Sequence, residues 1–245
     1  MARPQRLGAA HGRRLRRGGA VAVLLSLAAA ASAAPPAFED TMAQRVLACT
    51  GCHGAQGRAA ADGYYPRIAG KPAGYLANQL RNFRDGRRQY ALMNGLVAPL
   101  DDAYLAQIAD HFAALELPYP APAPGPALTP EQGALAARLI REGEPSRRVP
   151  ACTACHGSVM TGTAPFVPGL LGLPRDYLIA QLGAWRTGKR HAQAPDCMAQ
   201  VAQALTPEQI GAVAAWLAAQ PVPAGARPAP AFHARPPLPC GGVGP

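Results

Sequence analysis

A five-residue pattern, Cys-x-x-Cys-His, occurs twice in this chain. The first copy, CTGCH, spans residues 49–53, and the second, CTACH, spans residues 152–156. Thiols at positions i and i+3 face one side of a helical turn, so both can reach the vinyl groups of one porphyrin while the next histidine meets the iron. The pattern therefore predicts two sites of covalent c-type haem attachment. The predicted attachment points are Cys49, Cys52, Cys152 and Cys155, and the predicted proximal iron ligands are His53 and His156.

Three simpler interpretations of these cysteines compete with haem. Paired Cys-x-x-Cys knuckles can bind zinc, but such knuckles usually lie about 15–20 residues apart, whereas the two copies here are offset by 103 positions. A thioredoxin-like redox pair needs a βαβ setting, and no strand pattern surrounds either copy. Structural disulfides leave the repeated histidine unexplained. Haem is the favoured interpretation, and zinc is the main alternative.

The first 33 residues have the pattern of an export signal. A segment with six arginines and no acidic residue leads into an apolar run from Ala20 to Ala31, and Ala31-Ser32-Ala33 fits a small-residue cleavage site. The run is shorter than the roughly 20 residues that span a bilayer, so an uncleaved anchor is the weaker reading. We expect residues 1–33 to be a signal peptide, the mature protein to lack a transmembrane span, and its location to be the bacterial periplasm.

The basic character of the chain is concentrated in this leader. Without residues 1–33 the formal net charge falls from +10 to +4, and the four propionates of two haems would bring it near zero. No basic patch interleaved with aromatic residues is present, so nucleic acid is not an expected partner. Aromatic residues make up only 6% of the chain, which is little for two cores of about 100 residues each. A buried porphyrin in each half would supply the missing apolar bulk.

The two motifs belong to an internal repeat. The matched segments are Pro66–Gly70 with Pro168–Gly172, Tyr75–Leu80 with Tyr177–Leu182, and Phe83–Gly86 with Trp185–Gly188. The offset is 103 at the cysteines, 102 at the tyrosines and 105 at Met93 and Met198, so the repeat differs only by short insertions. It indicates one unit used twice.

Each repeat reads as helical, and no credible alternating strand is present. We expect leading helices at 39–48 and 130–141, middle helices at 73–84 and 175–187, and last helices that start near Asp101 and at Pro207. Thr129-Pro130-Glu131-Gln132 and Thr206-Pro207-Glu208-Gln209 are strong start signals, with threonine at the N-cap, proline at N1 and glutamine at N3. Dense prolines after Leu117 favour an extended spacer. The predicted organisation is a first domain at 34–117, a linker at 118–128, a second domain at 129–220 and a proline-rich tail at 221–245.

Two methionines at matched places are candidates for the second axial ligand of each iron. Met93 follows His53 by 40 residues, and Met198 follows His156 by 42 residues, both between the middle and last helices. A methionine is more often a core filler, but the matched positions favour ligation, and a histidine–methionine pair is typical of electron-transfer haems. The weaker candidates are Met42, Met160, His111, His191 and His233, of which His191 is the best alternative for the second haem.

Cys197 and Cys240 remain once four cysteines are assigned to haem. An even remainder in an oxidising compartment suggests a disulfide, which would tie the tail beside Met198. Two free buried thiols are the alternative.

These features together resemble the class I cytochromes c, and specifically the two-haem cytochrome c4 type. The resemblance covers about Phe38 to Gln220 and rests on both haem motifs, on Gly133 and Gly143 around the second leading helix, and on the helix starts after the methionines. It implies an all-α fold of two tandem domains, each a small helical globule around one covalent haem. It also implies that the carbonyls of Pro66 and Pro168 orient the proximal histidines. The tail and Cys197 depart from the pattern and suggest a sub-branch with a particular redox partner.

The expected function is electron transfer with two haem c groups. A six-coordinate haem leaves no open site for a substrate, so we expect single electrons to pass from a dehydrogenase or membrane complex to a terminal oxidase or reductase, through transient contacts of a monomer. One alternative is a cytochrome subunit held permanently in a dehydrogenase complex. A less favoured alternative is a two-haem peroxidase, the only one of these readings in which the chain would be an enzyme.

Overall fold

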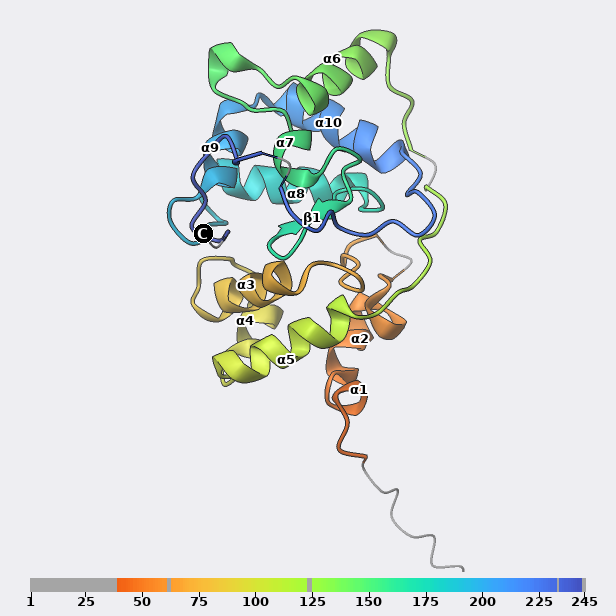
Figure 1. Ribbon diagram of the computed structural model, residues 1–245, viewed down its shortest axis with the longest axis vertical. Helices are drawn as coiled ribbons and strands as arrows, with labels where there is room; N and C mark the ends of the chain where they lie inside the picture. The colour runs from red at the N-terminus through yellow and green to blue at the C-terminus, as the bar shows by residue number, and fades with distance from the viewer. Residues whose placement is uncertain (1–38, 61–62, 123–124, 233, 244–245) are drawn as a thin grey trace, which may run out of the picture. The chain divides into compact units, whose positions relative to one another are not determined.

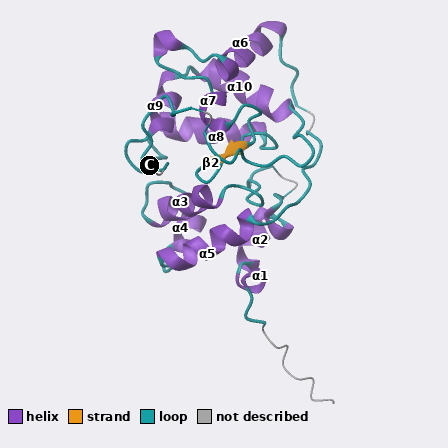
Figure 2. Cartoon of the chain, in the orientation of Figure 1, coloured by secondary structure: helices purple, strands orange, loops and turns teal. Residues whose placement is uncertain are grey.

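The computed structural model describes residues 39–60, 63–122, 125–232 and 234–243, and from Asp40 onward the chain forms one compact unit. The predicted signal peptide, residues 1–33, lies outside the described residues. Helices make up most of the regular structure (Figures 1 and 2), in agreement with the predicted all-α fold. Within the described chain, no helix is long and apolar enough to cross a membrane.

The first half, residues 40–117, contains five α-helices and a short 3-10 turn among its described residues. They are α1 (Met42–Arg45), α2 (Leu47–His53), the turn Ala55–Gly57, α3 (Ala73–Arg84), α4 (Ala91–Val97) and α5 (Asp102–Ala113). Helices α3 and α5 pack against each other, and α4 packs on α3. The repeat predicted from the sequence is therefore a repeat of helices.

The second half, residues 129–220, repeats this order and adds a small hairpin. Its elements are α6 (Pro130–Arg141), the 3-10 turn Pro145–Arg147, α7 (Thr153–His156), β1 (Gly162–Thr163), β2 (Val167–Pro168), α8 (Arg175–Arg186), α9 (Cys197–Ala204) and α10 (Pro207–Ala219). Strands β1 and β2 are antiparallel, with Gly162 opposite Pro168 and Thr163 opposite Val167. Helix α10 packs on both α6 and α8.

The helix starts follow the predicted capping chemistry. Thr129 and Thr206 each accept a hydrogen bond from the backbone N–H of the glutamine three residues on, whose side chain in turn accepts from the threonine N–H. These capping boxes satisfy two N–H groups that the first turn of a helix leaves without a partner. In the first half, the side chain of Asp101 caps α5 in a similar way by accepting from the Tyr104 N–H. Local sequence thus determines where these three helices begin.

Each half has its own core. In the second half, α6, α8 and α10 bury a continuous apolar cluster that includes Leu139, Ile140 and Leu217. In the first half, Val46, Ile108 and Phe112 centre one cluster, and Phe83, Val97 and Leu105 form another. The proposed domain boundaries at 117/118, 128/129 and 220/221 remain predictions, although no helix or strand falls within the described parts of the linker.

Three sequence predictions about the elements need correction. The leading helix expected at 39–48 ends at Arg45, and a second helix continues through the first haem motif to His53, because buried Val46 adopts a non-helical ψ of 10°. Met93 and Met198 lie on the short helices α4 and α9 and not in loops. The hairpin β1–β2 was not expected, since strands of two residues carry no alternation that a sequence could reveal.

Candidate functional site

The first haem motif is built on α2, which ends at His53. The ring of His53 is buried, and its Nδ1 lies 2.8 Å from the carbonyl oxygen of Pro66. A carbonyl can only accept, so Nδ1 carries the proton and Nε2 keeps its lone pair free. Gly54 ends the helix with φ of 74°, and a Cβ there would lie 2.3 Å from the Ala59 carbonyl oxygen. The backbone therefore turns sharply after the histidine and fixes its ring direction.

The second motif repeats this geometry. His156 ends α7, is buried, and places its Nδ1 2.8 Å from the carbonyl oxygen of Pro168. Gly157 follows with φ of 84°, and its Cβ would meet the Gly162 carbonyl oxygen at 2.8 Å. Both proline carbonyls lie where the family resemblance implied them. Burial lowers the pKa of both imidazoles, which favours the neutral ring that a metal ion needs.

The motif cysteines are unpaired in the structure and half-exposed. Burial raises the pKa of Cys49 and Cys155, and raises that of Cys152 to about 11, so these sulfurs are held as neutral thiols. Neutral thiols are poor metal ligands, because a metal ion binds the thiolate. Among the described residues, no group of three or more His, Cys, Asp and Glu side chains could hold a metal ion. This arrangement does not support a zinc knuckle.

A cavity of about 1700 Å³ brings the predicted site residues together. It is larger than the roughly 300–1,000 Å³ of an ordinary small-molecule pocket. Its lining includes the four motif cysteines, both histidines, Met93 and Met198. The competing candidates Met42, Met160, His111 and His191 do not line it, and His233 lies outside the described residues. The lining of the cavity thus favours Met93 and Met198 as the proposed axial ligands.

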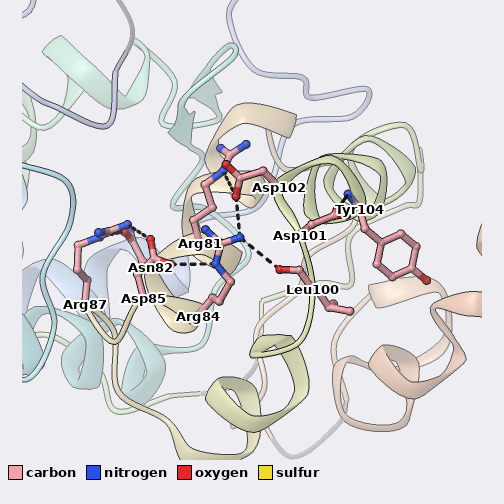
Figure 3. Close-up of polar contacts among 9 residues, drawn as sticks. All are labelled: Arg81, Asn82, Arg84, Asp85, Arg87, Leu100, Asp101, Asp102 and Tyr104. Carbon is pink, nitrogen blue, oxygen red and sulfur yellow. Dashed lines mark hydrogen bonds and ion pairs between the residues drawn. The ribbon is translucent and has the colours of Figure 1, made fainter.

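Met93 is positioned by polar contacts at both ends of its segment. Asn94, the next residue, donates to the Arg88 carbonyl (3.0 Å) and accepts from the Tyr90 N–H (2.7 Å), which holds the start of α4. Figure 3 shows the end of α3 and the start of α5, where Arg84 donates to the Leu100 carbonyl (3.3 Å) and to Asp102 (2.7 Å). Asn94 also donates to the Phe83 carbonyl of α3 (2.5 Å), so the segment that carries the methionine is fastened to α3 beside Met93 and again after α4.

The segment that carries Met198 is held differently from the Met93 segment at its start and in a similar way at its end. Asp196 caps α9 by accepting from the Ala199 N–H (3.0 Å), and Cys197 forms a disulfide with Cys240 of the tail. Arg186, which matches Arg84 in the repeat, donates to the Leu205 carbonyl. The disulfide that the even number of cysteines suggested is present in the structure, and it fastens the tail beside Met198.

The tail crosses the second half before it reaches this disulfide. Ala229 accepts from the Ala164 N–H (2.7 Å) and donates to the Gly162 carbonyl (2.9 Å), so it runs beside β1. Near its end, the carbonyl of Gly242 accepts from Asn78 of α3 (2.7 Å). The tail thus contacts both halves.

A cluster of arginines, glutamines and tyrosines joins the two halves. Arg88 donates to Gln79 (3.1 Å) and reaches across to Tyr177 (3.0 Å) and Gln181 (2.8 Å). Arg190, its match in the repeat, donates to Gln181 (2.7 Å) and reaches across to Gln79 (2.8 Å). Only 4% of Arg190 is exposed, and burial lowers its pKa to about 10. The sequence analysis missed these residues, although Arg88 and Arg190 could have been found as a matched pair just after the middle helices.

The residues around the cavity fit a haem group. Arg88 and Arg190 take part in no ion pair within the described chain, and a buried cation without an anion is costly. Two further buried donors, Arg175 Nε and Trp185 Nε1, have no hydrogen-bond partner among the described residues. Propionate carboxylates would satisfy such donors, and the free Nε2 of each histidine suits an iron. We therefore find agreement between these residues and the predicted prosthetic group.

Comparison with known proteins identifies the family. The profile of the family described as Cytochrome c matches residues 147–220. A thiosulfate dehydrogenase electron acceptor of Thiomonas intermedia is 40% identical over 189 residues, which cover 77% of this chain and 86% of that protein. Cytochrome c4 of Pseudomonas aeruginosa is 33% identical over 176 residues, which cover 71% of this chain and 84% of that protein.

A solved structure shares the fold. Thiosulfate dehydrogenase of Marichromatium purpuratum, in its as-isolated form, superposes with a TM-score of 0.62 at 35% identity. The match covers 71% of this chain but only 36% of that chain, so the present protein corresponds to about a third of its length. Taken with the paired haem motifs, these likenesses place the chain in the class I cytochrome c family, as an electron-transfer protein of the two-haem cytochrome c4 type that binds haem c covalently.

Proposed function

We propose that this protein is a periplasmic carrier that takes single electrons from a thiosulfate dehydrogenase and passes them to a terminal acceptor. The observation that carries the proposal is the pair of matched sites, each with a buried histidine whose Nδ1 is held 2.8 Å from a proline carbonyl. Such pairs suit two centres of the same kind within one chain. The relatives named as thiosulfate dehydrogenase electron acceptors support this choice of donor.

The role of each residue follows from its chemistry. Haem c supplies a one-electron iron centre when it is bound. The assigned residues are Cys49, Cys52, Cys152 and Cys155 for covalent attachment, His53 and His156 for the proximal side, and Met93 and Met198 for the opposite side. Pro66 and Pro168 fix the tautomer of each imidazole and raise its basicity. A filled methionine position leaves no site for a substrate, and a thioether ligand opposite histidine raises the reduction potential.

The cluster of arginines, glutamines and tyrosines lies at the junction of the two halves, and its charges would act on both haem centres. Arg88 and Arg190 are stacked on the rings of Phe83 and Trp185, at 4.4 and 3.7 Å from the ring centroids, and so have fixed positions. Their charges would neutralise propionates in a site from which water is largely excluded. Because each arginine bonds to residues of the other half, the cluster would also hold the two centres in a fixed relation.

The experiment is to purify the exported protein and count its haems. Haem staining after denaturing electrophoresis and a ferric spectrum with the methionine–iron band should show two covalent haems per chain, each with a methionine ligand. A matched pair of variants, Cys49→Ala/Cys52→Ala and Cys152→Ala/Cys155→Ala, should each retain one haem. An apoprotein that contains zinc, or rapid cyanide binding with peroxide turnover, would refute the assignment.

The donor is tested separately by stopped-flow spectroscopy. The oxidised protein should be reduced when thiosulfate and a thiosulfate dehydrogenase are both added, and should stay oxidised when either is left out. Reduction that is equally fast without the dehydrogenase would contradict this choice of donor, while the haem count would still stand.

A permanently attached subunit is the second candidate. The likeness to about a third of a longer chain that is named as a thiosulfate dehydrogenase favours it. Purification at high salt separates the two possibilities. A shuttle leaves its donor and runs as a monomer, whereas a subunit remains with the dehydrogenase.

A further inference from the structure

Lys71 reaches from the first half into the proximal side of the second site. It lies just before α3 and is only 4% exposed. Its Nζ donates to the carbonyl of Gly169 in the second half at 2.9 Å. Gly169 directly follows Pro168, whose carbonyl holds Nδ1 of His156. The lysine nitrogen is therefore bonded to the peptide unit next to the one that orients the proposed proximal ligand.

The repeat shows that this contact has no counterpart. With the local offset of 102, Lys71 matches Leu173, which is buried and carries neither charge nor donor. Arg88 and Arg190, in contrast, are matched and add similar charges to both halves. Buried Arg67 is also unmatched, since it falls on Gly169 in the repeat, but it donates to the Ala69, Leu117 and Pro118 carbonyls. Lys71 is thus an unmatched buried cation whose hydrogen bond reaches the second proposed centre.

The described part of the chain offers no anion to compensate the charge of Lys71. Within the described chain, no carboxylate forms an ion pair with Lys71. Its other neighbours are the guanidinium of Arg67, which repels it, and the ring of Tyr119, whose centroid lies 6.0 Å from Nζ. A charge with little solvent around it acts over a longer range than an exposed one. Its field therefore extends to the second site.

We propose that Lys71 is a positioning residue for electron flow, whose ammonium group raises the reduction potential of the second haem relative to the first. A ferrous haem carries one positive charge less than a ferric haem, so a nearby cation stabilises the reduced form. With haem bound, one electron would pass from the first iron, which would become ferric, to the second, which would become ferrous, without a proton or another reactant. The inference rests on the proposed assignment of His156 and Met198 to the second haem.

The test is a spectroelectrochemical titration of the intact two-haem protein at pH 6, where the ammonium is charged. The step that moves in Met198→His identifies the second haem. Lys71→Met should lower the equilibrium constant for reduction of the second haem about tenfold, which lowers its potential by about 59 mV for one electron. The potential of the first haem should not change. Lys71→Arg should keep most of the wild-type potential.

Two further variants separate charge from other effects. Lys71→Gln keeps a donor for Gly169 without the charge and should behave like Lys71→Met. Lys189→Met removes the only other lysine, which is exposed, and should move neither potential because water screens it.

Failure of this inference can be distinguished from failure of the proposed function. If the wild type lacks two covalent haems or their methionine bands, the function fails whatever Lys71 does. If these are intact and Lys71→Met leaves the second potential in place, or lowers both potentials equally, the inference is wrong. A wild-type potential in Lys71→Gln would likewise overturn it, because a hydrogen bond alone would then suffice.

Discussion

One proline carbonyl at each site determines what the proximal histidine can do. His53 and His156 are buried, burial lowers their pKa values, and each Nδ1–H donates a hydrogen bond to a proline carbonyl. The free Nε2 is then the only ring nitrogen able to bind a metal ion. The paired motif predicted both histidines, whereas the acceptors followed only from family resemblance, because nothing in the spacing of Pro66 or Pro168 fixes where a carbonyl points.

The proposed methionine ligands, Met93 and Met198, can be tested one at a time. Met93→Ala and Met198→Ala should each remove half of the methionine–iron band and lower the potential of one haem, because the iron loses its thioether. Covalent haem should remain at two per chain, since the cysteines are untouched. The measurement is the ferric visible spectrum with a redox titration.

Met160 provides the control for this prediction. It is 3% exposed in the second core and does not line the cavity. Met160→Ala should therefore cost about 2–5 kcal/mol of stability and leave the methionine band intact at low temperature. Loss of the band in Met160→Ala but not in Met198→Ala would reverse the assignment.

Lys71 also predicts a pH dependence of stability. Burial lowers its pKa from 10.5 to about 7 in the folded protein. Between these values the unfolded chain holds a proton that the folded chain does not, so this group makes the free energy of unfolding rise with pH, by up to about 1.4 kcal/mol per pH unit. Below pH 7 both states are protonated and the group adds no slope.

Urea unfolding at several pH values between 7 and 9.5 measures this slope. Lys71→Met should have a flatter dependence than the wild type, and exposed Lys189→Met should keep the wild-type slope. Arg67 and Tyr119 face Lys71 and are unchanged in both variants, so their titration cancels in the comparison. Equal slopes in all three proteins would show that Lys71 is not a buried amine in solution.

At the level of elements, the best predictions came from helix starts. The two Thr-Pro-Glu-Gln segments correctly predicted where α6 and α10 begin, because the capping box is a local interaction. The break at Val46 and the short helices α4 and α9 were not predicted, since they depend on which side chains the core accepts. Seven or eight residues without a repeated apolar spacing leave no periodic signal.

The capping boxes should contribute measurably to stability. Thr206→Ala removes the side-chain acceptor at the start of α10, which packs on both α6 and α8, and should cost about 1 kcal/mol. Thr206→Ser keeps the acceptor and should restore most of the loss. Thermal unfolding followed by far-UV circular dichroism measures both variants, and equal melting temperatures for Ala and Ser would contradict a capping role.

The disulfide makes the tail part of the second site. It closes a segment of 43 residues, and such a loop typically contributes about 2–4 kcal/mol. Cys197→Ser/Cys240→Ser should lose stability of this order and should lose the Met198 band at a lower urea concentration than the wild type, while the Met93 band is unaffected. Thiol titration of the denatured, non-reduced wild type provides the check, because two reactive thiols would mean that the bridge is absent.

At the scale of the whole molecule, the sequence could not predict the contacts between the two halves. The repeat indicated two similar halves, but it could not show which faces meet. The structure brings Arg88 and Arg190 into one cluster with Gln79 and Gln181, each arginine bonded across the junction. The buried guanidinium of Arg190 and the half-buried one of Arg88 repel each other, so polar partners and anions such as propionates should stabilise the cluster. The prosthetic groups and the junction should therefore stabilise each other.

This mutual dependence predicts how the protein unfolds. Arg88→Gln/Arg190→Gln removes the cross-junction bonds and the counter-charges, and should convert one cooperative thermal transition of the haem-loaded protein into two, because each half keeps its own core. Thr206→Ala then serves as a marker of the second half. In the wild-type background Thr206→Ala should lower the midpoint temperature of the single transition. In the double-arginine background it should lower the midpoint temperature of only one of the two transitions. If the double variant still melts in one step that Thr206→Ala shifts as a whole, the halves are coupled through other contacts, such as those of the tail with Asn78.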